Sequence, residues 1–415
     1  MSALIVSGVL TASALASAQT PPFDAPPPGA SDAAAAGGPP VTYTSPPPAP
    51  PPAPSTSVKV DGQNANIKFG LLAQPQYEAV GAPLADGMQH NLFLRRIRIL
   101  VGGTLFGQLD YFLDTDYANL FKNNAVGGAM ATPGFKNTPG LNIQDAFITY
   151  RPLGDLVKVD VGYMLPPLAH NALQGATTLY SLDYFSYSFA HSNAFGTSAD
   201  PIGRDLGVQV RGLVLDGRLE YRVGMFQGLR NAPVPAMPGP AQVGGRNFFR
   251  VAARLQLNLL DAETGFFYAG SYLGAKKLLS IGASFDFQGL ENGYRYWAVD
   301  AIADLPLGPG ALTAQVNLAQ WNAGDTAFLA LAKQTAIMGE AGYRLAAPPV
   351  GPIIRVEHRW GSGAVVDETR FALGGAFWWY QHNSNLKAFY TRVAPSGGGQ
   401  DAYNQFNLQW QVYFY

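Results

Sequence analysis

The chain has 415 residues, a formal net charge of −1 and only 13% charged residues, about half the usual share. This near-neutral balance lacks the basic excess that marks nucleic-acid-binding proteins, so no nucleic-acid partner is expected. Cysteine is absent, which excludes structural disulfides, thiolate metal sites and cysteine nucleophiles.

The first eighteen residues predict a signal peptide. Residues 1–18 read MSALIVSGVLTASALASA, an apolar run that is too short for a membrane helix and ends in the A-x-A-like sequence Ala16-Ser17-Ala18. The usual basic residue near the start is missing, which leaves a disordered apolar tail as the alternative.

Residues 19–57 predict a disordered linker. They are mostly Pro, Ala, Gly and Ser, and only Asp24 and Asp32 are charged. Such a segment cannot bury a core and favours an extended, partly polyproline spacer. A flexible tether is the simplest role, and a ligand for a proline-binding partner is the alternative.

From residue 58 to the end at 415, segments of about ten residues alternate apolar and polar side chains and are separated by turn residues. In RRIRILVG, for example, Ile97 and Ile99 share one phase while Arg96 and Arg98 share the other. Repeated segments of this kind are typical of a transmembrane antiparallel β-barrel. No later stretch has enough consecutive apolar residues for a helical span.

The connectors between these segments differ in length. Short turns are expected near 151–155, 215–217, 305–310, 346–352 and 382–385, and longer connectors at 118–140, 165–203, 229–246 and 322–334. Outer-membrane barrels have short turns in the periplasm and long loops outside. If 261–277 is a periplasmic connector, sixteen strands result, with fourteen or eighteen as alternatives.

The last thirteen residues, YNQFNLQWQVYFY, alternate between apolar and polar side chains. Phe406, Leu408 and Trp410 share the apolar phase, and Gln409 and Gln411 share the polar one. The apolar face of such a strand packs either on a protein core or on lipid. Along 350 residues with no linker, charged side chains lie on the strand phase opposite a continuous apolar band. A soluble sandwich has only about seven to nine strands per domain. One closed barrel around water therefore fits better than a soluble two-domain β protein.

Three runs carry a family resemblance: FLRRIRILVGGTLFGQLDYFLDTDYA (93–118), LNIQDAFITYRPLGDLVKVDVGYMLPP (141–167) and GRDLGVQVRGLVLDGRLEYRVGMFQG (203–228), followed by similar stretches at 271–289 and 385–395. In this order and spacing they resemble the phosphate-selective porins O and P, over about 85% of the chain. The resemblance implies a sixteen-stranded, trimeric outer-membrane porin. The arginine ladder of the phosphate-binding members does not map residue by residue onto this chain.

The polar phase predicts the side chains that line the pore. Arg96 and Arg98 should face a row of aspartates across a turn near Gly103–Thr104, either as structural ion pairs or as a field that selects polar solutes. Two arginine pairs, 250 with 254 and 355 with 359, are the best candidates for an anion-attracting strip. The residues selected as the predicted pore lining are Arg96, Arg98, Asp110, Asp114, Asp116, Lys158, Arg211, Arg222, Arg250, Arg254, Arg355 and Arg359. Lys68, Arg344 and Arg370 fall on the same inward phase, and the face of Arg95, near its strand end, is left open.

The connector 165–203 is the predicted constriction. It is the longest connector and is rich in aromatic side chains, which is unusual for a surface loop but suits one that folds into a barrel, where rings pack on the wall and hydroxyls face water. A cap on the barrel or a trimer contact is the alternative. The residues predicted to narrow the pore are Tyr180, Asp183, Tyr184, Tyr187 and His191.

The expected function is passive diffusion of small hydrophilic solutes through a Gram-negative outer membrane, with or without a mild preference for anions. The five histidines lack metal-ligand spacing, and neither a G-x-S-x-G elbow nor a phosphate loop is present, so no enzyme activity, metal or cofactor is expected. A specific phosphate or oxyanion channel and a structural or adhesive barrel with a plugged lumen remain alternatives. The expected partners are membrane lipid, lipopolysaccharide and the other copies of a homotrimer.

Overall fold

The computed structural model describes residues 58–81, 87–123, 136, 140–190, 203–228, 249–289, 293–322, 333–363, 365–397 and 401–415. The predicted signal peptide at 1–18 and the predicted linker at 19–57 lie outside these residues. Within the described ranges, no helix is long and apolar enough to cross a membrane.

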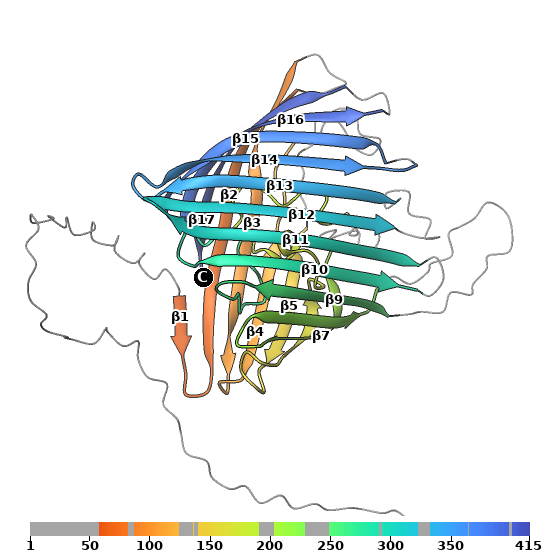
Figure 1. The fold of residues 1–415 in the computed structure, drawn as a ribbon. Helices are drawn as coiled ribbons and strands as arrows, with labels where there is room; N and C mark the ends of the chain where they lie inside the picture. The colour runs from red at the N-terminus through yellow and green to blue at the C-terminus, as the bar shows by residue number, and fades with distance from the viewer. Residues whose placement is uncertain are drawn as a thin grey trace, which may run out of the picture. The chain divides into compact units, whose positions relative to one another are not determined.

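The described chain is almost entirely β-structure, with one short 3₁₀ helix, η1 (His170–Leu173). The strands are long enough to show the alternation expected from the sequence, and they follow one another in chain order (Figure 1). They are β1 (Val58–Asp61), β2 (Asn66–Gly81), β3 (Met88–Leu105), β4 (Leu109–Asp116), β5 (Asn142–Tyr150), β6 (Lys158–Met164), β7 (Asp205–Val214), β8 (Leu219–Phe226), β9 (Arg250–Asn258), β10 (Leu278–Gln288), β11 (Tyr294–Leu307), β12 (Gly310–Asn322), β13 (Gln334–Leu345), β14 (Val350–Trp360), β15 (Asp367–Tyr380), β16 (Ser384–Ser396) and β17 (Tyr403–Phe414).

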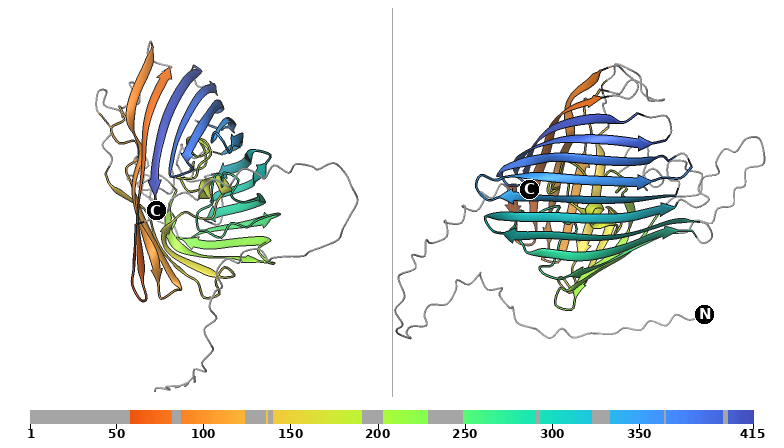
Figure 2. Two further views of the ribbon diagram at one scale, coloured as in Figure 1. Left: turned by 90° about the vertical axis from the view of Figure 1, so that its left-hand side faces the viewer. Right: turned by 45° about the horizontal axis from the view of Figure 1, so that its top comes forward.

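The sheet closes on itself as a sixteen-stranded antiparallel barrel. Each of β2 to β17 pairs with its neighbours in sequence, and β17 returns to pair with β2, as Leu408 opposite Tyr77 illustrates. Figure 2 shows the strands curving round the barrel. The short β1 pairs with the first residues of β2, beyond the point where β17 ends. The predicted barrel and its sixteen strands are therefore confirmed.

Among the described residues, closure of β2 to β17 leaves the ring without an open edge, which suits a wall that faces hydrocarbon. Along the strands, large apolar side chains on one phase are exposed, among them Ile99, Val299 and Leu373, while the polar phase is mostly buried. This is the reverse of a soluble protein, in which the apolar phase is the covered one. The outer surface of the barrel is thus the apolar one.

The turn between β3 and β4 differs from the sequence expectation. Gly103 and Thr104, where a turn was predicted, lie inside β3, and the chain reverses at Phe106–Gln108 instead. Phe106 and Gly107 take positive φ values of 51° and 70°, and this left-handed conformation is what a tight hairpin turn requires. The strand therefore continues through Gly103 and Thr104 to Leu105 before it turns.

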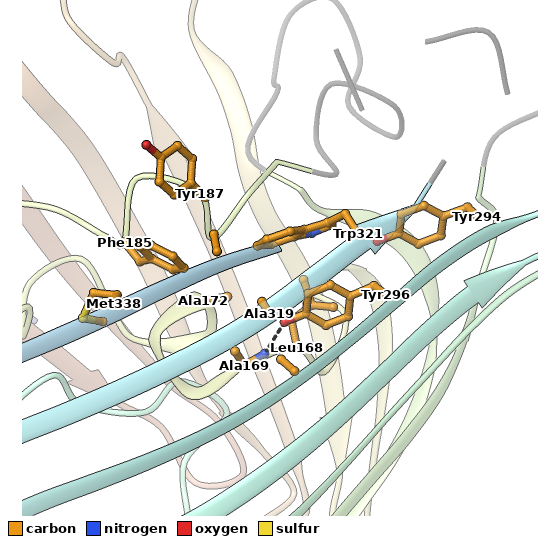
Figure 3. Packing of buried hydrophobic residues seen from close by; sticks show 12 residues of the cluster. Leu168, Ala169, Ala172, Phe185, Tyr187, Tyr294, Tyr296, Ala319, Trp321 and Met338 are labelled. Carbon is orange, nitrogen blue, oxygen red and sulfur yellow. Dashed lines mark hydrogen bonds between the residues drawn. The ribbon is translucent and has the colours of Figure 1, made fainter. Parts of the chain in front are cut away.

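The largest buried apolar cluster lies inside the barrel, where the connector after β6 packs against the wall. Leu168, Ala172 and Phe185 of the connector contact Tyr296 and Trp321 of β11 and β12 (Figure 3). The amide of Ala169 donates a hydrogen bond to the hydroxyl of Tyr296 at 3.2 Å. Without the connector this part of the lumen would be empty, so the connector gives the barrel interior a hydrophobic core.

Candidate functional site

Two connectors fold into the barrel from opposite ends. The first is 165–190, which leaves β6 at the end of the long connectors; the second is 259–277, which joins β9 to β10 at the end of the short turns. Inside the lumen they pair: Gly175 donates to the carbonyl of Tyr268 at 2.9 Å, and Tyr268 donates to the carbonyl of Leu173 at 3.0 Å. We call them the first and second inner connectors. Residues 191–202, including the predicted constriction residue His191, lie outside the described residues.

The two inner connectors cover one half of the inner wall, β7 to β13. Beneath them, arginines and carboxylates form ion pairs. Arg250 makes three hydrogen bonds to Asp286, at 2.9, 3.1 and 2.6 Å, and Arg254 makes two to Asp300, at 2.6 and 2.8 Å. The side chains of Arg250 and Arg254 are 0% and 1% exposed. Charges this deeply buried require such pairing, and they do not face open water.

The second inner connector is held by basic side chains of β6, β7 and β8. Lys158 donates to the carbonyl of Thr264 at 2.7 Å, and Arg222 donates to the carbonyl of Phe266 at 2.7 Å. His170 of the first connector bonds Glu263 of the second at 2.8 Å. Burial alone would raise the pKa of the Glu263 carboxyl, but His170 holds it below its ordinary value.

The other half of the inner wall, around β2 to β5 and β14 to β17, is only partly covered. There the first inner connector is fixed at its tip: Arg355 donates to the carbonyl of Asp183 at 2.6 Å, and Lys387 donates to the carbonyls of Leu179 and Ser181 at 2.5 and 2.8 Å. Two cavities border this half, one towards each end of the barrel, and the one at the end of the short turns is also lined by Arg211 of β7 and by the second inner connector.

The upper cavity, at the end of the long connectors, has a volume of about 530 Å³. Glu78, Asp183 and Glu357 are its acidic lining residues, and twice as many bases face them. The formal excess is three positive charges. The basic lining residues are Arg95, Arg96, Arg98, Lys122, Arg355 and Arg370.

The lower cavity, at the end of the short turns, has a volume of about 350 Å³, and its lining side chains again carry an excess of three positive charges. Lys68, Arg151, Lys158 and Arg211 line it, with Asp110 as the acidic lining residue. Arg151 pairs with Asp110 at 2.7 Å. The ammonium of Lys68 lies 5.4 Å from the ring centre of Tyr415.

An apolar layer separates the two cavities, which have no lining residue in common. Leu72 and Leu100 of the wall pack with Leu179 and Tyr184 of the first inner connector, and four further aromatic side chains pack against this group. We call this set the aromatic layer. The four further members are Phe112, Phe189, Tyr413 and Tyr415.

The C-terminal residue contributes to the aromatic layer because two glycines leave room for it. A Cβ on Gly102 would lie 2.0 Å from the hydroxyl of Tyr415, and one on Gly70 would lie 2.8 Å from its Cβ. The ring of Tyr415 also meets Phe112 edge-on at 5.8 Å. The last residue of the chain therefore lies against the inner wall of the barrel, whereas Trp410 on the same strand is exposed on the outside.

All twelve predicted pore residues lie on the inward phase, but the structure distributes them unevenly. Arg98 pairs with Asp114 and Asp116 at 3.4 and 3.0 Å, as the predicted facing rows require. Arg359 stacks on Tyr187, with the guanidinium 4.6 Å from the ring centre. Ten of the twelve are buried, and Asp110 and Arg359 are partly exposed. The buried ones are Arg96, Arg98, Asp114, Asp116, Lys158, Arg211, Arg222, Arg250, Arg254 and Arg355.

The burial of most predicted pore residues differs from what a pore fully lined by water would show. Arg250 and Arg254, expected to form an anion-attracting strip, lie under the inner connectors, and each is neutralised by a carboxylate. Arg355 pairs with Glu340 and Glu357, while Arg359 remains beside the first inner connector. The second inner connector is the reason for this difference. The sequence predicted 261–277 as a periplasmic connector and did not predict that it folds over that half of the wall.

The predicted constriction residues lie on the first inner connector in different surroundings. Asp183 and Tyr184 line the upper cavity. Tyr180 stacks on Trp378 of β15, with ring centres 5.7 Å apart. The hydroxyl of Tyr187 donates to Glu368 at 2.6 Å. The connector therefore brings two of them to the water and packs two against the wall.

Two basic residues of the cavities were missed from the sequence, and the face of a third was left open. Arg95 and Lys122 line the upper cavity, and Arg151 lines the lower one. Arg95 directly precedes Arg96, so strict alternation assigns it to the outer face, and Lys122 and Arg151 belong to connectors. The aromatic run Phe266-Phe267-Tyr268 was a usable signal for the second inner connector, because aromatic residues in a turn segment suggest packing on a wall.

Residues 73–213 match the family model described as phosphate-selective porin O and P. The resemblance seen in the sequence is confirmed. Solved porin and channel structures also resemble the chain. An anion-selective porin from Comamonas acidovorans has 12% identity and a TM-score of 0.56, over 84% of this chain and all of that one.

Two further structures resemble this porin-like barrel. OprB of Pseudomonas putida has 10% identity and a TM-score of 0.56, over 84% of this chain and 94% of that one. The outer-membrane channel DcaP of Acinetobacter baumannii has 10% identity and a TM-score of 0.51, over 85% of this chain and 99% of that one. No curated protein matches the sequence. At these identities, the structural similarity defines the fold.

Proposed function

We propose that the protein is a passive channel of a Gram-negative outer membrane that carries small hydrophilic solutes and prefers anions. Support comes from the closed barrel with an apolar outer surface and from the match of residues 73–213 to a porin family. A barrel of this kind crosses a membrane without exposing unpaired backbone groups to lipid. No step of this function needs chemical turnover.

The anion preference rests on one observation. The chain as a whole has a net charge of −1, yet the lining of each cavity has an excess of three positive charges. A lumen with low-dielectric walls focuses the field of its lining charges and raises the local concentration of counter-ions. Chloride, carboxylates and phosphates are therefore expected to enter more readily than cations.

The proposed path joins the upper and lower cavities along β2 and β3, which line both. It passes the aromatic layer, where Tyr184 and Phe189 border the upper cavity and Phe112 and Tyr415 border the lower one. Small displacements of these side chains would open the path, and the layer would then be its narrowest point. This places the size limit of the pore at the aromatic layer.

Export and assembly belong to the same proposal. The predicted signal peptide, residues 1–18, would be cleaved, and the barrel would lie among lipid and lipopolysaccharide as a homotrimer. Strands β4, β5, β6 and β8 have only seven to nine residues. At the usual rise and tilt they span about 20 Å, less than the apolar band of about 25 Å in such barrels. This side of the wall fits contact with another copy better than contact with lipid.

Planar-bilayer recording of the purified full-length protein tests the channel. We expect steady single-channel currents and, in a potassium chloride gradient, a reversal potential of the sign that chloride permeation produces. A reversal potential of the opposite sign would contradict the anion preference. Mass measurement of the mature protein and migration on unheated gels would test the signal peptide and the trimer.

Two alternatives are separated by the same recording. The pairing of the two inner connectors across the lumen favours a structural barrel with a plugged interior, which would give folded protein without current. The six basic residues of the upper cavity favour a specific phosphate or oxyanion channel. That channel would show a chloride conductance that saturates at low salt and is blocked by phosphate.

A further inference from the structure

Asp183, at the tip of the first inner connector, occupies a site between two arginines of β3. Its Oδ2 accepts hydrogen bonds from Arg95, at 2.8 Å from Nε and 2.6 Å from a terminal nitrogen. Its Oδ1 accepts from Arg96 at 2.5 Å and from the amide of Tyr184 at 2.9 Å. Each oxygen of one carboxylate thus meets its own guanidinium, an arrangement that suits carboxylates in general.

Arg96 is held in place by contacts other than that with Asp183. Arg96 donates from its other terminal nitrogen to Gln74 at 2.9 Å, and its guanidinium lies 5.5 Å from the ring centre of Tyr184. The side chain of Arg96 is 3% exposed, so its position is fixed by packing on every side. Arg95 is 22% exposed and borders the upper cavity. The Arg96 part of the site would therefore persist if Asp183 turned away, with Arg95 beside it at the border of the cavity.

The backbone of the connector is also held independently of the Asp183 side chain. Arg355 donates to the hydroxyl of Ser181 at 2.7 Å and to the carbonyls of Asp183 and Tyr184 at 2.6 and 2.5 Å. Lys387 donates to the carbonyls of Leu179 and Ser181. Rotation of the Asp183 side chain thus leaves the connector in place, and exchange at the site needs no unfolding of the loop.

The site is open to the upper cavity on the side where solutes arrive. The Asp183 side chain is 39% exposed. Phe93, Phe185, Phe189 and Phe389 line the same cavity, so an apolar body attached to a carboxylate would find aromatic surface beside the arginines. One carboxylate faces two guanidinium groups, which leaves the site with a positive charge even when Asp183 is bound.

We propose that the Arg95–Arg96 pair is a binding site for the carboxylate of an organic solute, and that Asp183 is an internal ligand which that solute displaces. The inference rests on the proposed channel function and deepens it by naming the solute class and the place where it pauses. The internal ligand keeps the site weak, which suits a channel because a solute that bound tightly would not leave.

Calorimetric titration of the detergent-solubilised full-length protein with benzoate tests the site apart from conduction. If Asp183 occupies the arginines at least nine-tenths of the time, Asp183→Ala should bind benzoate about tenfold or more tightly than the wild type. Asp110→Ala is the matched control, since Asp110 is also paired with an arginine, is 38% exposed and lines the lower cavity. Its affinity for benzoate should equal that of the wild type.

Further variants distinguish the effect of removing the Asp183 side chain from the arginines from the effect of removing its charge. Arg95→Gln in the Asp183→Ala background should lose the gain. Asp183→Asn keeps the shape but loses the charge, so it should give a smaller gain and serves if the alanine variant does not fold. The proposal would be overturned if neither Asp183 variant bound benzoate more tightly than the wild type. It would also be overturned if Asp110→Ala gained as much affinity for benzoate, or if the Asp183 variants gained as much affinity for inorganic phosphate.

The outcomes for the site and for the channel are distinguishable. Tighter benzoate binding by Asp183→Ala in a protein that carries no current would support the site and contradict the proposed channel. A normal current with unchanged benzoate binding in both Asp183 variants would leave the channel intact and overturn the site.

Discussion

Both halves of the inner wall carry charged side chains on their inward phase, but these side chains have different roles in the two halves. Under the inner connectors, Arg250 and Arg254 are buried and each is matched by an aspartate. Along the open half, Arg95 and Asp183 at the upper cavity and Arg151 and Asp110 at the lower cavity are partly exposed. Bases outnumber acids in both linings. Ion pairs that are covered fix the connectors in the lumen, whereas charges that are left partly uncovered attract solutes.

Covered pairs and open charges therefore respond differently to substitution. Loss of one member of a covered pair leaves a charge buried without a partner, which costs several kcal/mol of folding stability. Loss of an open charge costs little stability because water replaces the partner. The same change of residue should alter stability in one half and selectivity in the other.

The largest effect is expected in the covered half. Arg254→Ala leaves Asp300 buried beneath Leu168 and His170 without its guanidinium, and should lower the free energy of unfolding by about 3–5 kcal/mol. Urea titration of the folded barrel in detergent measures this. Arg254→Leu combined with Asp300→Leu is the control and should cost less. A loss below 1 kcal/mol in the single variant would contradict the distinction between the halves.

The second effect concerns the outer face of the open half. Leu373 faces outward on β15, and its neighbour Ala372 faces the upper cavity. Leu373→Arg should destabilise the barrel in lipid by about 2–4 kcal/mol, as charges do near the middle of a bilayer, and Ala372→Arg should be milder. Folding titrations in lipid vesicles give both values. The reverse order would mean that the apolar phase does not face lipid.

A third effect lies at the border of the two halves. His382, in the turn between β15 and β16, donates to the carbonyl of Ser271 in the second inner connector at 2.8 Å. Burial, followed by the nearby charges of Lys387 and Arg344, lowers the pKa of His382 to about 4. Since the folded state binds the proton less readily than the unfolded state, this stability is present above about pH 6.5 and is lost as the pH falls towards 4.

The expected loss is about 1–3 kcal/mol across that range. Urea titrations between pH 7 and pH 4 would show it, and His382→Gln should reduce the dependence on pH. An unchanged pH dependence in this variant would show that His382 is not its source.

The smallest effect is expected from single open charges. Lys68→Gln removes one base from the lower cavity and should lower the permeability ratio of chloride to potassium by a factor of about 2–5, the effect of about 0.5–1 kcal/mol for a solvated charge. Arg218→Gln, at an exposed short turn, is the control and should leave the ratio unchanged. Reversal potentials in a salt gradient measure both, and equal shifts would mean that the cavity charge has no special role.

Much of the fold follows from local pattern. Period-two alternation from residue 58 onward predicted the barrel, its apolar outer face and the inward phase of the arginines, because a strand places successive side chains on opposite faces. Aromatic density predicted that 165–203 folds inward. The count of sixteen strands depended on treating 261–277 as a connector.

What the sequence left open depends on contacts between distant segments. Alternation gives the face of Arg254 but does not say that residues 259–277 return into the lumen and cover it. The pairing of Asp183 with Arg95 joins residues 88 positions apart, across a long connector whose path local preferences do not determine. The positive excess of the cavities likewise exists only once the covered pairs are set aside.

The central claim is that water and solutes pass through the partly open half of the barrel, and two single-cysteine variants of β16 test it directly. Thr391 lines the upper cavity, and Tyr390 faces outward. A negatively charged, membrane-impermeant thiol reagent should reduce the single-channel current of Thr391→Cys and leave that of Tyr390→Cys unchanged. Modification of Tyr390→Cys with Thr391→Cys unaffected would contradict the account.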